Sequence, residues 1–242
     1  MTANDQRLCR NILLKTMLPD DFALLTPLLS HVTCGFGEVV AVPGQPIDAV
    51  YFPETGIITF SKPSDEGSRI GIGHTGYEGF SAWSLLLGCN LAPHEARMTA
   101  TGGTAYRIAA GDFLAVCGTS ETLRDLLLRF VRAFTAQLSS TIVSSLTQAV
   151  DTRLCRWTLM AHDRVEGDDL VVTHSEIAVM LGIRRASVTD ALHVLEGDRL
   201  IRANRGHITI LNRDALRSRA GTTYGFAEEE YSRLIAPFPE RG

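Results

Sequence analysis

Residues 173–196 read THSEIAVMLGIRRASVTDALHVLE, and this stretch decides the fold of the C-terminal part of the chain. Thr173 and Glu176 have the spacing of a capping box, in which a hydroxyl and a carboxylate bind the free backbone N–H groups at a helix start. We expect this first helix to point Ile177, Met180 and Leu181 into the core. Gly182 follows where a left-handed turn is needed, and a second amphipathic helix begins at about Arg184. Two short helices joined through a glycine predict a helix-turn-helix.

The second helix, from about Arg184 to Glu196, carries side chains suited to a DNA major groove. Its inward positions are Val188, Ala191, Leu192 and Leu195. The candidate DNA contacts on the two helices are His174, Ser175, Arg184, Arg185, Ser187, Thr189 and Asp190. We assign Arg185 to a guanine edge and Asp190 to a cytosine amino group, since their donors and acceptors match those edges. The hydroxyl residues suit base edges or phosphates, and His174 suits a phosphate.

A hairpin follows the second helix. Residues 200–211 read as two β segments around the turn Asn204-Arg205-Gly206. Arg205 and His207 lie at this tip, where we expect phosphate contacts. An amphipathic helix over residues 151–164 precedes the helix-turn-helix. Helix, helix-turn-helix and hairpin, in this order, predict a winged helix.

The N-terminal half has a different sequence pattern. Between His31 and Phe113 short β-type runs alternate with glycine and proline, which predicts a small antiparallel barrel or roll. The expected strands cover residues 39–42, 49–52, 56–60, 69–73, 98–101 and 105–108. Two short helices are expected before them, over residues 7–17 and 19–29. The predicted fold class is therefore α+β, with a jelly-roll-like sensor domain ahead of the winged helix.

Apolar residues then recur at steps of three and four over more than six turns, which predicts one long helix. We interpret it as a dimerisation helix, because its stripe is too continuous to face only a small barrel. The alternative is a long helix packed wholly inside one chain. The predicted dimer contacts are Leu123, Leu127, Phe130, Phe134 and Leu138. The predicted domains are the sensor roll (1–118), the dimerisation helix (119–149), the winged helix (150–217) and a helical tail (218–242).

Composition limits the function classes. The net charge of −4 means that DNA binding must rest on a local basic patch. Five scattered cysteines show no metal or iron–sulfur spacing, so neither a metal nor a cofactor is predicted. The chain has no signal-peptide core, no apolar run of membrane-spanning length and no nucleophile–base motif. These features favour a cytoplasmic protein that is not an enzyme.

With these residues in view, the chain resembles the Crp–Fnr family of bacterial transcription regulators over nearly its whole length. The specific part is the pattern of Thr173, Glu176, Ile177, Ala178, Gly182, Val188, Leu192, Leu195, Glu196, Leu200 and Ile201. The resemblance implies a cyclic-nucleotide-binding type of roll, a dimerisation helix and a winged helix. It also implies a homodimer on a pseudo-palindromic site in double-stranded DNA, and RNA polymerase as a partner if the protein activates transcription.

Two departures from the family pattern limit what the resemblance implies. Family members that read the best-known site carry Arg, Glu and Arg on the second helix, whereas this chain has Arg185, Ala186 and Asp190, so we expect a different target sequence. The effector pocket departs as well, because no Lys or Arg precedes Arg97 within the expected phosphate-binding segment. Glu78 and Arg97 are the candidate pocket residues, with a structural role favoured for Glu78. Cyclic-nucleotide binding is disfavoured, and any effector is an unidentified small molecule.

A second function class remains open. The chain could be a small-ligand sensor that acts mainly through protein partners, with the winged helix as an interaction surface. The acidic net charge and Asp190 favour this alternative slightly. A DNA titration over a salt series separates the two classes, because DNA binding weakens steeply as salt rises.

Overall fold

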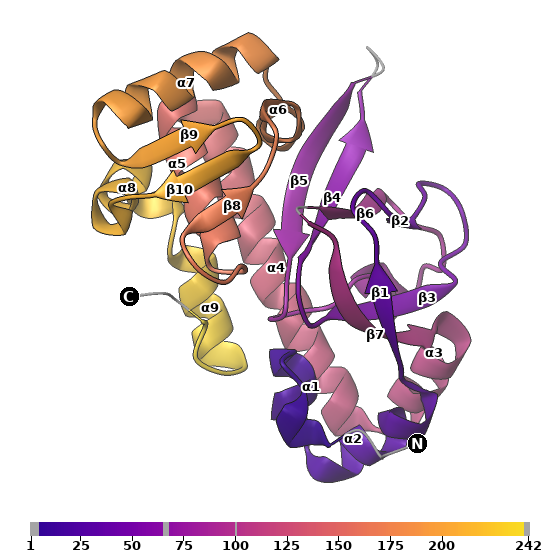
Figure 1. Cartoon of the computed structure of the whole chain (residues 1–242). Coiled ribbons are helices and arrows are strands. Elements are labelled where there is room, and N and C mark those ends of the chain that lie inside the picture. Colours follow the sequence, from indigo (N-terminus) through magenta and orange to yellow (C-terminus); the bar gives the residue numbers. More distant parts are fainter. Residues whose placement is uncertain (1–4, 65–67, 100, 240–242) are drawn as a thin grey trace.

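Antiparallel strands form the N-terminal lobe of the computed structural model, which describes residues 5–64, 68–99 and 101–239 (Figure 1). The strands pair in the orders β1-β7-β3 and β2-β6-β4-β5, which confirms the predicted roll. Their bounds are β1 (Ser30–Cys34), β2 (Val39–Ala41), β3 (Ala49–Pro53), β4 (Ile57–Pro63), β5 (Arg69–Thr75), β6 (Glu95–Thr99) and β7 (Gly103–Ala109). The sequence reasoning missed β1, which has only one buried residue and therefore no apolar run.

Short helices close one end of the roll. They are η1 (Gln6–Leu8), α1 (Ile12–Thr16), α2 (Pro19–Leu25), η2 (Thr26–Leu28), η3 (Trp83–Leu87) and α3 (Ala110–Thr119). The prediction of one helix over residues 7–17 was wrong. Asn11 interrupts it, because its side chain caps α1 by accepting from the Leu14 N–H at 3.2 Å while its own N–H donates to Glu54 at 2.8 Å.

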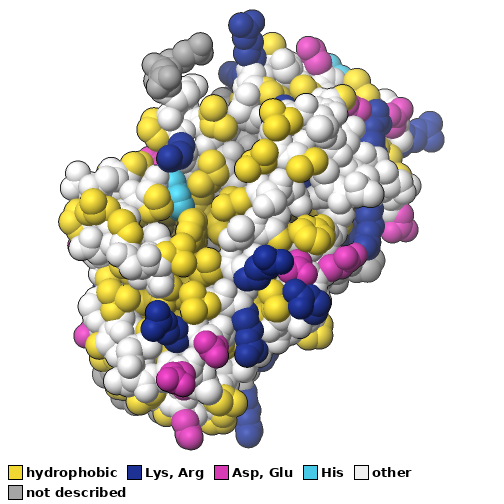
Figure 2. All heavy atoms as spheres, turned by 180° about the vertical axis from the view of Figure 1, so that it is seen from behind, with side chains coloured by type: hydrophobic (Ala, Val, Ile, Leu, Met, Phe, Trp, Pro, Cys, Tyr) yellow, Lys and Arg dark blue, Asp and Glu magenta, His cyan; other side chains and the backbone are white. Residues whose placement is uncertain are grey.

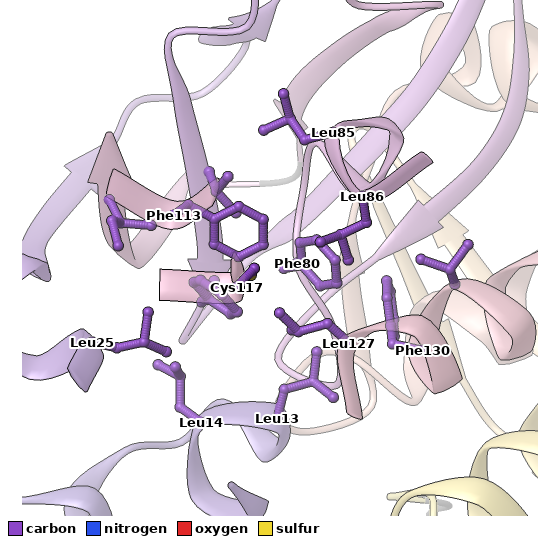
Figure 3. Packing of buried hydrophobic residues seen from close by; sticks show 14 of the residues in the cluster. Leu13, Leu14, Leu25, Phe80, Leu85, Leu86, Phe113, Cys117, Leu127 and Phe130 are labelled. Carbon is purple, nitrogen blue, oxygen red and sulfur yellow. The ribbon is translucent and has the colours of Figure 1, made fainter. Parts of the chain in front are cut away.

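The core of this lobe lies where the short helices meet the roll and the long helix α4 (Glu121–Thr147). Figure 3 shows the side chains that converge there: Leu13, Leu14, Leu25, Phe80, Leu85, Leu86, Phe113, Cys117, Leu127 and Phe130. By length and composition α4 could cross a membrane, which corrects the expectation that no run is long enough. Its mean hydropathy of 1.2 over the most apolar stretch is modest, and 44% of that stretch is buried in the chain, as in a core helix.

The predicted dimer stripe of α4 needs a correction. Leu123, Leu127, Phe130 and Phe134 are at most 3% exposed in the single chain, and Leu138 is half-buried against the same core. These side chains already pack on the roll of their own chain. They are therefore not available to a second copy, and the alternative of packing inside one chain describes this stripe.

The C-terminal lobe is a winged helix, as predicted. Its elements are α5 (Val150–His162), β8 (Asp169–Val171), α6 (His174–Leu181), α7 (Arg185–Gly197), β9 (Ile201–Asn204), β10 (His207–Ile210) and α8 (Arg213–Ala220). Strands β8, β10 and β9 pair in that order, so the expected hairpin has a third strand. The sequence reasoning missed β8 because three residues are too short for a periodic pattern, and it missed α8, which buries only Leu216 and Ala220.

Helix packing joins the lobes in two places, in addition to polar contacts such as the Glu78–Arg164 ion pair (Figure 1). Helix α6 packs on β5, so closely that a Cβ atom added to Gly71 would lie 2.7 Å from the Cα atom of Met180. Beyond η4 (Gly221–Thr223), helix α9 (Phe226–Leu234) packs along α4. The helix-turn-helix is therefore held against the outer face of the roll.

Candidate nucleic-acid interface

The start of α6 is built by the predicted capping box. The Thr173 hydroxyl accepts from the Glu176 N–H at 3.2 Å, and the Thr173 N–H donates to the Glu176 carboxylate at 2.8 Å. Both groups satisfy backbone N–H groups that would otherwise lack partners. The carboxylate of Glu176 is thereby held at the helix start.

The turn between α6 and α7 depends on Gly182. Its φ of +61° lies in the left-handed region, where a residue with a Cβ atom is strained. A Cβ atom there would also lie 3.1 Å from a side-chain carbon of Ile70 on the roll. The Arg153 guanidinium donates to the Leu181 carbonyl at the end of α6. The sequence reasoning missed Arg153, since nothing in the local pattern links it to this turn.

Helix α7 buries the predicted face, namely Val188, Ala191, Leu192 and Leu195. Met180 differs from the prediction, because it is half-buried against the roll and not in the winged-helix core. On the opposite face Arg184, Arg185, Ala186, Asp190 and His193 are exposed, while Ser187 and Thr189 are half-buried. The first two turns of α7 therefore offer two guanidinium groups, a methyl group and a carboxylate to the outside.

Thr189 and His174 are brought together by the fold. The His174 Nδ1 atom lies 3.0 Å from the Thr189 Oγ1 atom, and the same hydroxyl donates to the Arg185 carbonyl at 3.3 Å. This contact connects the start of α6 to α7. Ser175, one residue further along α6, is exposed.

The wing lies beside these helices. Arg205 and His207 are both exposed at the turn between β9 and β10, where Gly206 has a φ of +78°. The Val172 N–H donates to the Gly206 carbonyl at 3.0 Å, which fixes the tip against the start of α6. At the other end of α7, the Glu196 carboxylate accepts from the Ala203 N–H of β9 at 2.7 Å. Glu196 thus positions the wing, a role that its place in the motif did not reveal.

The two candidate pocket residues do not share a site. Glu78 is 2% exposed, forms an ion pair with Arg164 at 2.8 Å and accepts from the Gly76 N–H at 2.9 Å. Arg97 lies on β6, where it pairs with Glu95 at 3.0 Å and donates to the Gly37 carbonyl. Each side chain is thus engaged in contacts of the chain itself, in different parts of the roll.

Aromatic rings fill the roll next to α4. Phe60 and Phe134 have ring centroids 5.2 Å apart, Trp83 and Phe134 5.6 Å, and Phe80 and Phe130 5.1 Å. His94 joins this group, and burial together with the charge of Lys62 lowers the pKa of its ring to about 4. Within the described residues, no three His, Cys, Asp or Glu side chains gather as a metal site would require.

Part of the C-terminal lobe matches the model of a known domain family. Residues 152–219 match the family model of the Crp-like helix-turn-helix domain. No curated protein matches the chain in sequence. Residues 152–219 of the C-terminal lobe are therefore similar to a Crp-like helix-turn-helix domain.

Several solved structures share the fold over most of the chain. A CRP-family transcriptional regulator from Thermus thermophilus has a TM-score of 0.66 at 18% identity, covering 80% of this chain and 97% of that one. FixK2 from Bradyrhizobium japonicum has a TM-score of 0.68 at 13% identity, covering 80% and 98%. A crp/fnr-family protein from Eubacterium rectale has a TM-score of 0.67 at 18% identity, covering 86% and 97%. The resemblance drawn from the sequence is confirmed at the level of the fold.

Proposed function

We propose that the chain is a homodimeric, sequence-specific DNA-binding regulator of transcription, with α7 in the major groove. The observation that carries this proposal is the outward face of α7, with Arg184 and Arg185 exposed at its start, on a Crp-like helix-turn-helix. The exposed Arg205 and His207 of the wing lie beside it. Residues at the start of a recognition helix contact base edges, whereas a basic wing contacts phosphates.

Each exposed side chain of α7 has a role in this proposal. Arg185 donates to a guanine edge, Asp190 accepts from a cytosine amino group, and the Ala186 methyl group suits a thymine methyl. Arg184 and Ser187 contact phosphate. Thr189 orients the helix start through His174 and does not read a base, because its hydroxyl is already engaged.

The dimer in this proposal uses the outer face of α4 in place of the predicted stripe. Residues on this face recur at steps of four and three toward the end of the helix: Thr135, Ser139, Ile142 and Leu146. Ile142 is 60% exposed and Leu146 80% exposed, and Val143 beside them is 51% exposed. Figure 2 shows hydrophobic side chains gathered in the middle of the face along which α4 runs. A stripe with this spacing suits a coiled-coil contact with a second copy.

The proposal places the protein in the cytoplasm, where a bacterial regulator meets its DNA, with RNA polymerase as a partner when the bound site activates a promoter. It assigns no cyclic nucleotide to the roll. The supporting observations are the aromatic packing beside α4 and the engagement of Glu78 with Arg164. A buried cyclic phosphate without an arginine partner would lose the charge-assisted contacts it needs.

Selection of bound duplexes from a random-sequence pool tests this function. A dimer is expected to enrich a two-fold symmetric site whose half-sites are about 34 Å, or one helical turn, apart. Recovery of sequences without a shared half-site would contradict sequence-specific binding. The Arg184→Ala/Arg185→Ala variant serves as the control, because it keeps the fold but loses the proposed contacts.

A further inference from the structure

A cavity lies between the outer face of the roll and the winged helix, away from the aromatic interior of the roll. Its roll side is formed by Ile57, Thr59 and Thr99, and its other side by Trp157 of α5, Leu170 of β8 and Met180 of α6. Its interior holds a volume of about 40 Å³, and the cavity is partly open to solvent. Its walls are mostly apolar, which is typical of small-molecule sites.

Two buried polar atoms of this region lack a hydrogen-bond partner within the part of the chain that the structure describes. They are the Nε2 atom of His74 and the Nε1 atom of Trp157. Both residues line this cavity and an adjoining one that reaches toward Arg153 and Arg156. Because a buried donor or acceptor without a partner is destabilising, a group that satisfies these atoms would bind favourably.

The chemistry of these two atoms is complementary. Burial, and next the charges of Arg164 and Arg156, hold the pKa of His74 well below its ordinary value, so the ring is neutral near pH 7. The Met160 carbonyl hydrogen-bonds the ring, which assigns the proton to Nδ1 and leaves Nε2 as an acceptor. The indole N–H of Trp157 is only a donor. A hydroxyl group can accept from one and donate to the other.

The charged groups nearby are already engaged. Arg156 donates to the Thr223 and Gln137 carbonyls at 2.8 and 3.3 Å, and Arg153 donates to the Leu181 carbonyl. Glu176 is held in the capping box. Arg153 and Arg156 line the adjoining cavity, and Glu176 is the only charged side chain among the described residues that line this one. An anion would meet no counter-charge here, so the apolar walls favour an uncharged molecule.

We propose that the cavity between the roll and the winged helix binds a small, uncharged, mainly apolar molecule that carries a hydroxyl group. The ligand would touch β4 and β6 of the roll together with α5, β8 and α6. Filling this space favours one arrangement of the helix-turn-helix against the roll, so bound ligand and DNA affinity are coupled in both directions. This last step rests on the proposed function, whereas binding itself does not.

Fluorescence of Trp157 tests the site without DNA. The chain has two tryptophans, so the Trp83→Phe variant leaves Trp157 as the only reporter. Benzyl alcohol is the probe, and toluene is its counterpart without the hydroxyl. We expect a saturable change in Trp157 emission, with benzyl alcohol binding about tenfold more tightly than toluene, as a hydrogen bond from the hydroxyl to His74 implies.

Two variants in the same background provide the controls. His74→Phe should abolish the preference for benzyl alcohol over toluene, and Ala161→Leu, which fills the cavity from α5, should abolish the response to both. Circular dichroism verifies that each variant is folded. If Ala161→Leu is unfolded, the His74→Phe variant and the comparison of the two probes still test whether the site exists.

The outcomes separate the site from the function. No saturation below the solubility limit of benzyl alcohol, or an unchanged preference in His74→Phe, would overturn the site. A protein that binds benzyl alcohol but no DNA would leave the site intact and contradict the proposed function. A protein that binds DNA but not benzyl alcohol would overturn the site and leave the proposed function intact.

Discussion

His94 lies in the roll against the rings of Phe60 and Trp83, at centroid distances of 5.1 and 5.4 Å, and is 7% exposed. Its folded pKa of about 4 is below the ordinary value of 6.5. The neutral ring therefore stabilises the fold above pH 6.5, and this contribution is lost as the pH falls toward 4.

The His94→Phe variant should remove this pH dependence and keep the ring contacts. We expect the unfolding free energy of the wild type to fall relative to the variant by up to about 3 kcal/mol between pH 6.5 and 4. Urea unfolding at fixed protein concentration measures it. Asp163 and Glu228, whose pKa values burial raises, act in the opposite direction but are common to both proteins. If the unfolding free energies of the two proteins change with pH in parallel, His94 is not the source of this pH dependence.

The sequence predicts a structural role for Glu78, and the contacts of Glu78 show what it holds in place. Besides Arg164, its backbone carbonyl accepts from the Tyr231 hydroxyl of α9 at 2.7 Å. The motif position alone could not show these partners, because they lie 86 and 153 residues away in the chain. We assign Glu78 to the joint between the lobes.

Arg164→Met should destabilise the protein by about 3–5 kcal/mol, because it leaves the Glu78 carboxylate buried without its counter-charge. Adding Glu78→Gln to that variant should recover part of the loss. Urea unfolding of the single and double variants measures both effects. A loss below about 1 kcal/mol, unaffected by Glu78→Gln, would argue against a structural pair.

At the scale of elements, the contact of α6 with β5 is the tightest link between the helix-turn-helix and the roll. Gly71 permits it, since a Cβ atom there would lie 2.7 Å from the Met180 Cα atom, which is backbone and cannot move alone. The position of α6, and with it that of α7, depends on this glycine.

Gly71→Ala should therefore push α6 away from the roll and lower stability by about 1–3 kcal/mol through overpacking. Hydrogen exchange should speed up in α6 and β5 while the roll core stays protected. Gly118→Ala is the matched control, because this exposed helical glycine has open space around it and the change should stabilise α3 by up to about 1 kcal/mol. Equal effects of the two changes would contradict the proposed tight contact.

The elements also show which features a sequence can predict. The capping box and Gly182 were predictable, because caps and left-handed turns depend on residues within one helix turn. The face of α4 that we propose for the dimer was not predictable, since the strongest apolar stripe of α4, from Leu123 to Phe134, packs on its own roll. A periodic pattern indicates that a helix face is buried, but it does not indicate whether the chain's own roll or a second copy buries it. Strand β8 was missed because three residues are too few for a periodic pattern and its partner β10 lies far along the chain.

At the scale of the whole molecule, binding to a two-fold symmetric site requires a dimer, which we place at the exposed end of α4. Leu146→Glu should shift the protein toward the monomer, because it places like charges against one another across a two-fold interface. Sedimentation velocity measures the change. Leu8→Glu is the control, since Leu8 is similarly exposed, at 79% against 80%, but lies outside α4. A Leu146→Glu protein that stays dimeric would place the interface elsewhere.

In the proposed function, a local basic face on an acidic protein binds DNA. The most direct measurement is the affinity for the selected duplex over a salt series, for wild type, Arg184→Ala/Arg185→Ala and Arg7→Ala/Lys15→Ala. The two variants lose the same charge, but Arg7 and Lys15 are exposed near the N-terminus, far from α7 (Figure 1).

We expect wild-type affinity to fall steeply with salt. The α7 variant should bind at least tenfold more weakly, since one bidentate arginine–guanine pair contributes about 1–3 kcal/mol, and its salt slope should fall by about one for each phosphate that no longer pairs with an arginine. The Arg7→Ala/Lys15→Ala protein should have the same DNA affinity and the same salt slope as the wild type. Equal losses in both variants, or affinity that does not depend on salt, would contradict the claim that α7 is the DNA-reading element.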